Sequence, residues 1–310
     1  MSLPSSLSER LKLPVIAAPM FIISRPKLVI AQCRAGIVGA FPSLNARKPG
    51  EFEEWLQLLN ETLGPDDAPY AVNLILHRSN IRLEEDLALC VKYKVPIVIT
   101  SLGARVEVNE AIHSYGGIVF HDVINQTFAH KAIEKGADGL VLVAAGAGGH
   151  AGTLSPFALV QETREWFDGP IALSGSIANG ASIAAAKVMG ADLGYMGSAF
   201  IATEEADAVP AYKQMIADSD ADDIIYTNLF TGVHGNYLKP SIVNAGINPD
   251  ELADKEAKHM NFGDMGSDAK AWKDIWGCGQ GIGAVKSIQP AAVFIEKLKE
   301  EYAIAAKRLA

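Results

Sequence analysis

Cysteine is scarce in this sequence, and its placement indicates neither a disulfide framework nor a structural metal. Cys33, Cys90 and Cys278 are odd in number, lie far apart and form no Cys-x-x-Cys pair. No spacing of histidines suggests a shared metal either. We therefore expect no bound metal, and a cytoplasmic location, where thiols stay reduced.

Positive charge and long apolar runs are also lacking. Lys and Arg total 27 against 36 Asp and Glu, a formal charge of −9, and no basic run resembles a nucleic-acid footprint. No apolar run approaches the roughly 18 residues that span a bilayer. The first residues lack the basic and then apolar pattern of a signal peptide. We expect a soluble, unprocessed protein with no nucleic-acid or membrane partner.

What the sequence does contain is a regular alternation of two patterns. Eight β-branched or alanine-rich apolar segments cover residues 14–19, 36–41, 70–75, 96–101, 117–123, 139–145, 170–175 and 193–198. Amphipathic helical patterns separate them, with apolar residues three and four apart. Continuous apolar strands alternating with helices indicate a parallel sheet that is buried on both faces. Eight such units predict an α/β fold of the (β/α)8 TIM barrel type rather than an open doubly wound sheet.

The remainder of the chain is less regular. Residues 203–285 hold one helical piece followed by irregular segments, and a final helix is expected over 290–308. We interpret 203–285 as an inserted excursion that caps the active face. The barrel itself is then formed by residues 1–202 and 286–310.

In a barrel of this kind the carboxyl ends of the strands carry the chemistry. The last two strands end in Gly175–Ser176 and Gly197–Ser198. Glycines let the backbone approach a ligand closely, and amide and hydroxyl groups there can bind an anion. Either loop alone could be an ordinary turn, but together they predict a phosphate site.

The stretch "AAGAGGHAG", residues 144–152, surrounds His150 with small residues. Gly146, Gly148 and Ala151 match the spacing of a dinucleotide fingerprint. However, the next helix is expected to begin only near Ser155–Pro156, and the next strand lacks the acidic residue of that fingerprint. We therefore interpret residues 144–152 as a loop whose backbone and His150 imidazole lie against a ligand, rather than as a dinucleotide fingerprint.

Several segments together carry a family resemblance. They are "PVIAAPM" (14–20), "AVNLI" (71–75), "GAGGHAG" (146–152), "PIALSGSIANGASIAAAKVMGADLGYMGSAFIATEEA" (170–206) and "WGCGQGIGAV" (276–285). In this order they resemble the nitronate monooxygenase family, formerly 2-nitropropane dioxygenases. The family consists of FMN-dependent (β/α)8 barrels, and its relatives include NADH:quinone reductases and a flavin-dependent enoyl reductase. The resemblance thus implies an FMN enzyme, which oxidises alkyl nitronates with O₂ to carbonyl compounds and nitrite.

The resemblance also implies site residues. The histidine of the family's active site matches His150. The positions that match its flavin contacts, together with the hydroxyl of Ser176, form the expected cofactor site: Ala18, Pro19, Met20, Asn73, Gly149, Gly175, Ser176, Met196, Gly197 and Ser198. Two departures concern the substrate. Ala144–Ala145 lie where members often have a Gln that contacts flavin, and "TGVHGNYLKPSI" (231–242) lacks the family's usual Arg.

Six further residues are candidates for the substrate pocket: His121, His234, Tyr237, Lys239, Trp276 and Gln280. Each could instead have a purely structural role as a loop joint, solvated loop residue or hydrophobic anchor. Three alternatives to the nitronate reaction stay open. They are an NAD(P)H-dependent quinone or enoyl reductase on the same FMN barrel, a flavin-free barrel isomerase or lyase with a phosphorylated substrate, and a non-catalytic binding protein. A homodimer is a possible assembly.

Overall fold

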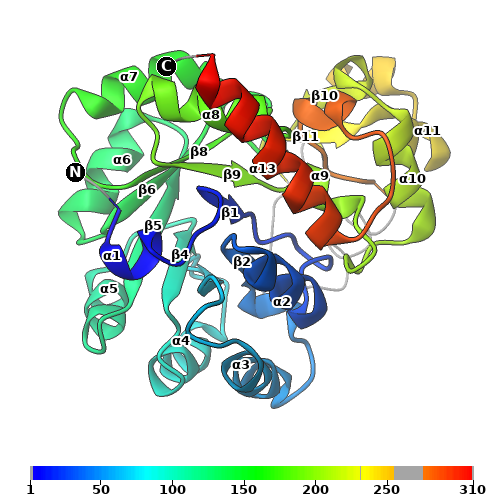
Figure 1. Ribbon diagram of the computed structural model, residues 1–310. Helices are drawn as coiled ribbons and strands as arrows, with labels where there is room; N and C mark the ends of the chain where they lie inside the picture. Colours follow the sequence, from blue (N-terminus) through cyan, green and yellow to red (C-terminus); the bar gives the residue numbers. More distant parts are fainter. Residues whose placement is uncertain (1–2, 231, 255–274, 309–310) are drawn as a thin grey trace.

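Eight parallel strands form the centre of the fold (Figure 1). The computed structural model describes residues 3–230, 232–254 and 275–308. The strands are β1 (Val15–Ala17), β2 (Gly39–Pro42), β3 (Tyr70–Ile75), β4 (Ile97–Ser101), β5 (Ile118–Val123), β6 (Gly139–Val143), β8 (Ile171–Ser174) and β9 (Leu193–Met196). They pair in the order β1-β9-β8-β6-β5-β4-β3-β2.

Two backbone hydrogen bonds join the ends of this series. Ala17 N–H donates to the Val38 carbonyl at 2.7 Å, and Val38 N–H donates to the Val15 carbonyl at 3.0 Å. They connect β1 to the chain entering β2, so the sheet closes on itself. The predicted (β/α)8 TIM barrel is confirmed.

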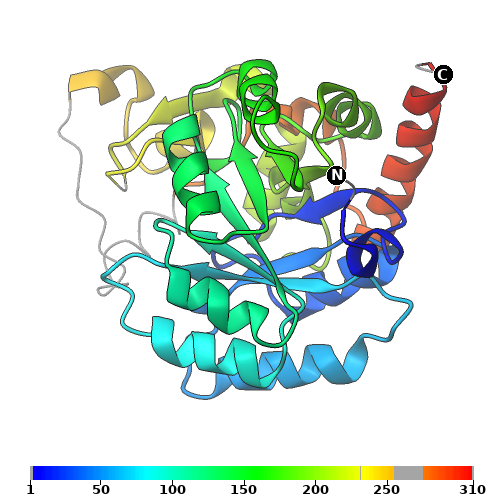
Figure 2. The same cartoon turned by 90° about the vertical axis from the view of Figure 1, so that its left-hand side faces the viewer.

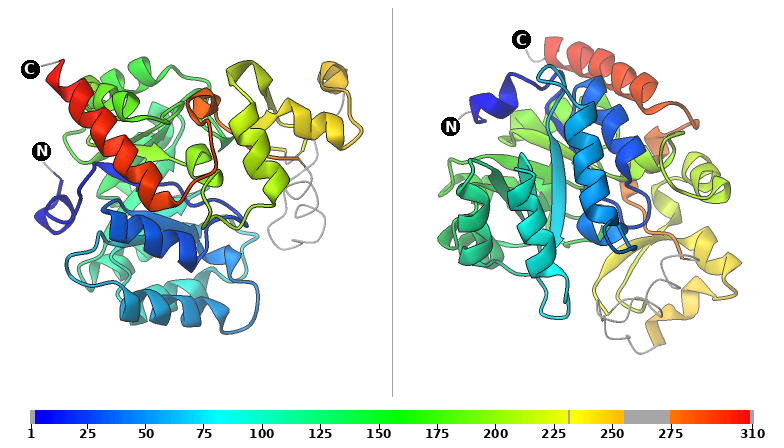
Figure 3. Two further views of the ribbon diagram at one scale, coloured as in Figure 1. Left: turned by 45° about the vertical axis from the view of Figure 1, so that its right-hand side comes forward. Right: turned by 90° about the horizontal axis from the view of Figure 1, so that it is seen from below.

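In the described part of the chain, eight helices cover the outside of the sheet, and Figure 2 shows several of them around it. They are α2 (Pro26–Ala35), α3 (Glu51–Thr62), α4 (Leu83–Lys92), α5 (Val106–His113), α6 (Gln126–Glu134), α7 (Pro156–Arg164), α8 (Gly180–Met189) and α13 (Ala291–Lys307). The last helix packs against α8 and α2, as the two views in Figure 3 show. The C-terminal helix therefore completes the ring around the barrel, as the sequence pattern predicts.

Strand alternation divides the core into two layers. Residues such as Ile16, Ile99 and Phe120 fill the barrel interior, whereas Val98 and Val119 pack outward against the helices. The short helix α1 (Ser5–Ser8) adds Leu7 to the interior cluster. With the lower interior filled by apolar side chains, polar chemistry is confined to the carboxyl ends of the strands.

The excursion lies at that end of the barrel, on the side toward which the β9 arrow points in Figure 1. The short helix α9 (Ser198–Ile201) precedes it, and its regular elements are α10 (Pro210–Asp218), β10 (Ile224–Thr227), β11 (Gly235–Leu238) and α11 (Lys239–Asn244). Short 3₁₀ turns cover Ser43–Asn45, Ala221–Asp223, Pro249–Asp254 and Gln280–Ala284. Part of the predicted cap, residues 255–274, lies outside the described residues, and the division into barrel and insert stays a prediction.

The excursion and the glycine loop share a second, three-stranded sheet. Strand β7 (Gly149–His150) pairs antiparallel with β11, which pairs antiparallel with β10. The segment that carries His150 is therefore fixed by residues more than 80 positions away in sequence. Within the described parts of the chain, no helix is long and apolar enough to cross a membrane.

Candidate active site

A small pocket opens where β8 and β9 end. Its wall comes from four segments: the glycine loop after β6, the turns after β8 and β9, and the C-terminal segment before α13. Its lining consists of Gly146, Ala147, Gly148, Ser174, Gly175, Ser176, Ile177, Ala178, Tyr195, Gly197, Ser198, Ala199, Gly279 and Gly281. The predicted residues Gly175, Ser176, Gly197 and Ser198 are thus brought together.

The backbone at this pocket is shaped for close approach. Gly175 has φ +131° and Ser176 has φ +57°, so the turn after β8 lies in the left-handed region that most side chains avoid. A Cβ added to Gly148 would lie 2.6 Å from Ser198 Oγ and 2.7 Å from Gly279 N. Gly279 N–H donates to Ser198 Oγ at 2.8 Å. The loops therefore meet through backbone and hydroxyl groups.

The turn after β1 borders the same region. Ala18 N–H donates to the Met196 carbonyl at 2.8 Å. A Cβ on Gly197 would lie 3.3 Å from Ala18 Cβ and 3.9 Å from Met20 Sδ. The turn after β1 therefore lies beside Met196 and Gly197. The side chain of Met196 is buried on the outer side of the sheet, so Met196 contacts this turn through its backbone.

His150 lies on β7, opposite Gly235 of β11. Gly149 before it has φ +66°, a conformation that favours glycine. Burial lowers the pKa of the His150 imidazole to about 4. The ring is therefore neutral at physiological pH, with one nitrogen that donates and one that accepts a hydrogen bond.

The excursion holds this loop in place from one side. Asn236 is buried, and its Nδ2 donates to the Ala147 carbonyl at 2.7 Å. The Asn236 carbonyl accepts from Cys278 N–H at 3.0 Å. Tyr226 Oη donates to the Ala151 carbonyl at 2.9 Å. Asn236 therefore links the glycine loop to the C-terminal segment that completes the pocket.

Asn45 holds the turn after β1. Its side chain is buried, and Nδ2 donates to the Met20 carbonyl at 3.0 Å and the Ser24 carbonyl at 2.8 Å. Its Oδ1 accepts from Ile22 N–H at 2.8 Å. Ile22 has φ +70°, a strained conformation for a β-branched residue. One amide side chain thus fixes the turn that carries Met20.

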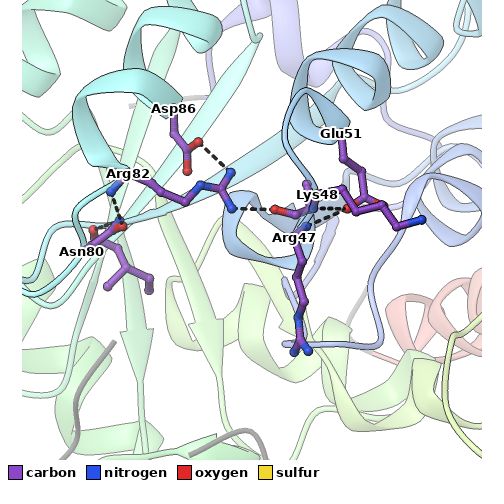
Figure 4. A network of polar contacts seen from close by, with 8 residues as sticks. Arg47, Lys48, Glu51, Asn80, Arg82 and Asp86 are labelled. Carbon is purple, nitrogen blue, oxygen red and sulfur yellow. Dashed lines mark hydrogen bonds and ion pairs between the residues drawn. The ribbon is translucent and has the colours of Figure 1, made fainter. Parts of the chain in front are cut away.

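A polar network links the chain just after Asn45 to the turn after β3 (Figure 4). Arg82 donates to the Ala46 carbonyl at 2.5 Å and forms an ion pair with Asp86 at 2.9 Å. Asn80 accepts from Arg82 N–H at 3.1 Å. The turns after β1, β2 and β3 are therefore joined on the active face.

Replacing Asn45 should loosen this face. We expect Asn45→Ala to lower the free energy of unfolding by about 2–4 kcal/mol, because three hydrogen bonds of a buried side chain are lost and the Ser24 carbonyl and the Ile22 amide lose this partner, whereas the Met20 carbonyl keeps the bond from Ser24 N–H. Denaturant unfolding measures the change. Gln57→Ala, which removes an exposed bond to Glu61, should change it by less than about 0.5 kcal/mol. Equal effects of the two variants would contradict the role given to Asn45.

Asn73 lies at the barrel mouth and faces inward. Its Nδ2 donates to the Ile99 carbonyl at 3.0 Å and to Ser101 Oγ at 2.7 Å. His121, by contrast, shares the outer side of the sheet with Thr100, whose Oγ1 lies 2.6 Å from His121 Nδ1. Burial lowers the pKa of His121 to about 4. The structure thus places this predicted pocket residue between sheet and helices.

Most of the other predicted pocket residues also lie elsewhere. Tyr237 is buried in a cluster with Ile242, Leu252 and Ile275 because β11 turns that face into the excursion. Lys239 Nζ donates to the Asp222 carbonyl at 2.7 Å beside an open surface groove. Trp276 stacks on Tyr212, with ring centroids 4.7 Å apart.

Two of the six candidates approach the glycine loop. His234 is exposed and stacks on Tyr226, and its carbonyl accepts from Ala151 N–H at 3.2 Å. Gln280 N–H donates to the Gly146 carbonyl at 2.9 Å. Gln280 is therefore the candidate nearest to the pocket wall.

Sequence reasoning did not single out three residues of the site, Asn45, Gly279 and Gly281. The alternating glycines at 277, 279 and 281 are a signal for close backbone approach. Nothing local marks Asn45, because its partners are distant in sequence. Among the described residues no group of three His, Cys, Asp or Glu side chains could hold a metal ion.

Comparisons with known proteins agree with this geometry. The chain is 26% identical to a nitronate monooxygenase of Paraburkholderia phytofirmans, over 93% of this chain and 92% of the relative. Its fold is similar to a nitroalkane oxidase of Streptomyces ansochromogenes, with a TM-score of 0.84 and 22% identity over 98% of this chain and 100% of that one. FabK of Thermotoga maritima has a TM-score of 0.81 and 24% identity over 98% and 97%.

The family model for nitronate monooxygenase matches residues 52–301. This range includes the glycine loop, both turns of the pocket and the segment with Gly279 and Gly281. The chain therefore belongs to the nitronate monooxygenase family of oxidoreductases.

Proposed function

We propose that this enzyme binds FMN and oxidises alkyl nitronates with O₂ to carbonyl compounds and nitrite. The observation that carries the proposal is the glycine-lined pocket at the ends of β8 and β9, next to the loop of His150. In (β/α)8 barrels these two loops and a short following helix commonly bind a phosphate.

The residues present fit the phosphate end of FMN. The first amides of α9 have no partner within that helix, as at any helix start. The hydroxyls of Ser176 and Ser198 border the same pocket. Gly146, Gly148, Gly279 and Gly281 contribute only backbone to the opposite wall. The turn at Ala18–Met20 lies next to Gly197 of this pocket, and Asn73 on β3 lies at the barrel mouth. The planar ring system would lie between them.

The chain's own groups have defined tasks in this reaction. A nitronate is an anion that has already lost the proton next to its nitro group, so its oxidation needs no strong base. The neutral His150 imidazole suits this task because its N–H can donate to a nitronate oxygen. Residues 146–148 of the glycine loop line the pocket, and His150 follows them on β7. When bound, FMN supplies the acceptor that takes electrons from the nitronate and passes them to O₂. Two nitronates and one O₂ yield two carbonyl compounds and two nitrite ions, which balances atoms and charge.

Flavin reduction in the absence of O₂ tests the proposal. Protein loaded with FMN is mixed with propionate-3-nitronate or with NADH, and the loss of the yellow flavin absorbance is followed. We expect the nitronate to bleach the flavin and NADH to leave it oxidised.

The other outcomes identify the alternatives. Fast bleaching by NADH alone would contradict the nitronate reaction and support a quinone or enoyl reductase. A colourless protein that does not take up FMN would indicate a flavin-free isomerase or lyase. Bound flavin that neither compound reduces would favour a binding protein.

A further inference from the structure

A layer of polar side chains crosses the upper barrel interior, where Asn73, Ser101, Asp122 and Tyr195 follow inward-facing apolar residues on their strands. Asp122 has no task in the reaction proposed above. Within the described residues its hydrogen-bond partner is Ser101, whose hydroxyl donates to Asp122 Oδ2 at 2.5 Å. Such short bonds are typical of a hydroxyl donating to a carboxylate.

The donors and acceptors of this layer form a directed chain. An ionised carboxylate only accepts, so the Ser101 proton points toward Asp122. The lone pairs of Ser101 Oγ then accept from Asn73 Nδ2 at 2.7 Å, and the second Nδ2 proton goes to the Ile99 carbonyl at 3.0 Å. Both amide protons of Asn73 are used, and within the described chain Oδ1 is the amide atom left for a ligand at the barrel mouth.

We propose that Asp122 is a positioning residue that, through Ser101, holds the Asn73 amide with Oδ1 toward the flavin. When Asp122 takes up a proton, its own O–H donates to Ser101 Oγ. The Ser101 hydroxyl no longer has a fixed acceptor, and the hold on Asn73 weakens. This inference rests on the proposed binding of FMN. It adds that the affinity for FMN depends on the protonation state of Asp122.

The surroundings of Asp122 favour titration near neutral pH. Burial raises the pKa of its carboxyl to about 6, and the bond from Ser101 only partly opposes this rise. On β9, burial and the Asp122 charge raise the pKa of Tyr195 well above its usual value, so this phenol stays neutral. His121 next to it faces outward, and His150 lies on the loop after β6 with a pKa of about 4. Between pH 5 and 8, Asp122 is therefore the group of this set that changes charge.

The test compares FMN affinity across pH in wild type, Asp122→Asn and Ser101→Ala, with fluorescence quenching as the readout. The phosphate of FMN also titrates near pH 6, so the informative quantity is the ratio of dissociation constants between variant and wild type. We expect this ratio for Asp122→Asn to rise from about 1 at pH 5 to at least about 5 at pH 8, because the amide mimics the protonated carboxyl. Ser101→Ala should show the same trend.

Thr100→Val is the matched control, since Thr100 is the next residue on β4 but faces His121 on the outer side. For Thr100→Val, the ratio of the FMN dissociation constants of variant and wild type should stay constant with pH. A ratio for Asp122→Asn that is independent of pH would overturn the inference, whether or not affinity is lost. If Asp122→Asn does not fold, Ser101→Ala decides by the same criterion. Wild type that binds no FMN at any pH would instead refute the proposed function.

Discussion

His150→Asn lowers the turnover of a nitronate about 10²- to 10⁴-fold while FMN content stays unchanged, the size of effect expected for a positioned acid–base or hydrogen-bonding group. The reason is that His150 follows directly on the glycine loop, whose residues 146–148 line the pocket. Anaerobic flavin reduction by nitronate measures the loss directly. Because the pKa of His150 is about 4, its protonation should affect the rate only as the pH falls toward 4.

A second histidine provides the control for this experiment. His130 stacks on Trp166 at 3.8 Å on the outside of the barrel, so His130→Asn should leave turnover within twofold of wild type. If His150→Asn with bound flavin also kept turnover within that range, the imidazole would have no part in the reaction.

Gly148→Ala should have the largest effect on the cofactor. The added Cβ would meet Ser198 Oγ at 2.6 Å and Gly279 N at 2.7 Å, so the glycine loop and the C-terminal segment must move apart. We expect the dissociation constant of FMN to rise at least about tenfold, which corresponds to about 1.4 kcal/mol. Fluorescence titration of the protein with FMN measures it.

Gly64→Ala is the corresponding control, because its added Cβ would meet only Asp67 Oδ2, at 3.8 Å. Its FMN affinity should equal that of wild type. Unchanged affinity in Gly148→Ala would show that the pocket at the ends of β8 and β9 does not hold the cofactor.

The barrel was predictable because each strand and helix has a local signature. The eight apolar segments correspond to the eight barrel strands, and α7 begins at Pro156, as the Ser-Pro pair indicates. Strand β7 was not predicted. Gly149 and His150 have no strand pattern of their own, and their pairing depends on β11, far along the chain.

The site was predictable where a turn follows a strand directly. Gly175, Ser176, Gly197 and Ser198 meet because neighbouring parallel strands end at one edge. At the end of β5 the pattern pointed to both residues 121 and 122, but strand alternation places only Asp122 with Phe120 on the interior side and turns His121 outward. The side chains of Asn45 and Asn236 act through contacts that no local pattern reveals.

The segment from residue 279 through α13 contributes both to the pocket and to the ring of helices. Residues 279 and 281 close the pocket, and α13 follows at once and seals the barrel between α8 and α2. A growing chain that ends before this segment has all eight barrel strands but neither a complete site nor a complete helical ring. The proposed FMN complex therefore requires this segment, and FMN should oppose its local unfolding.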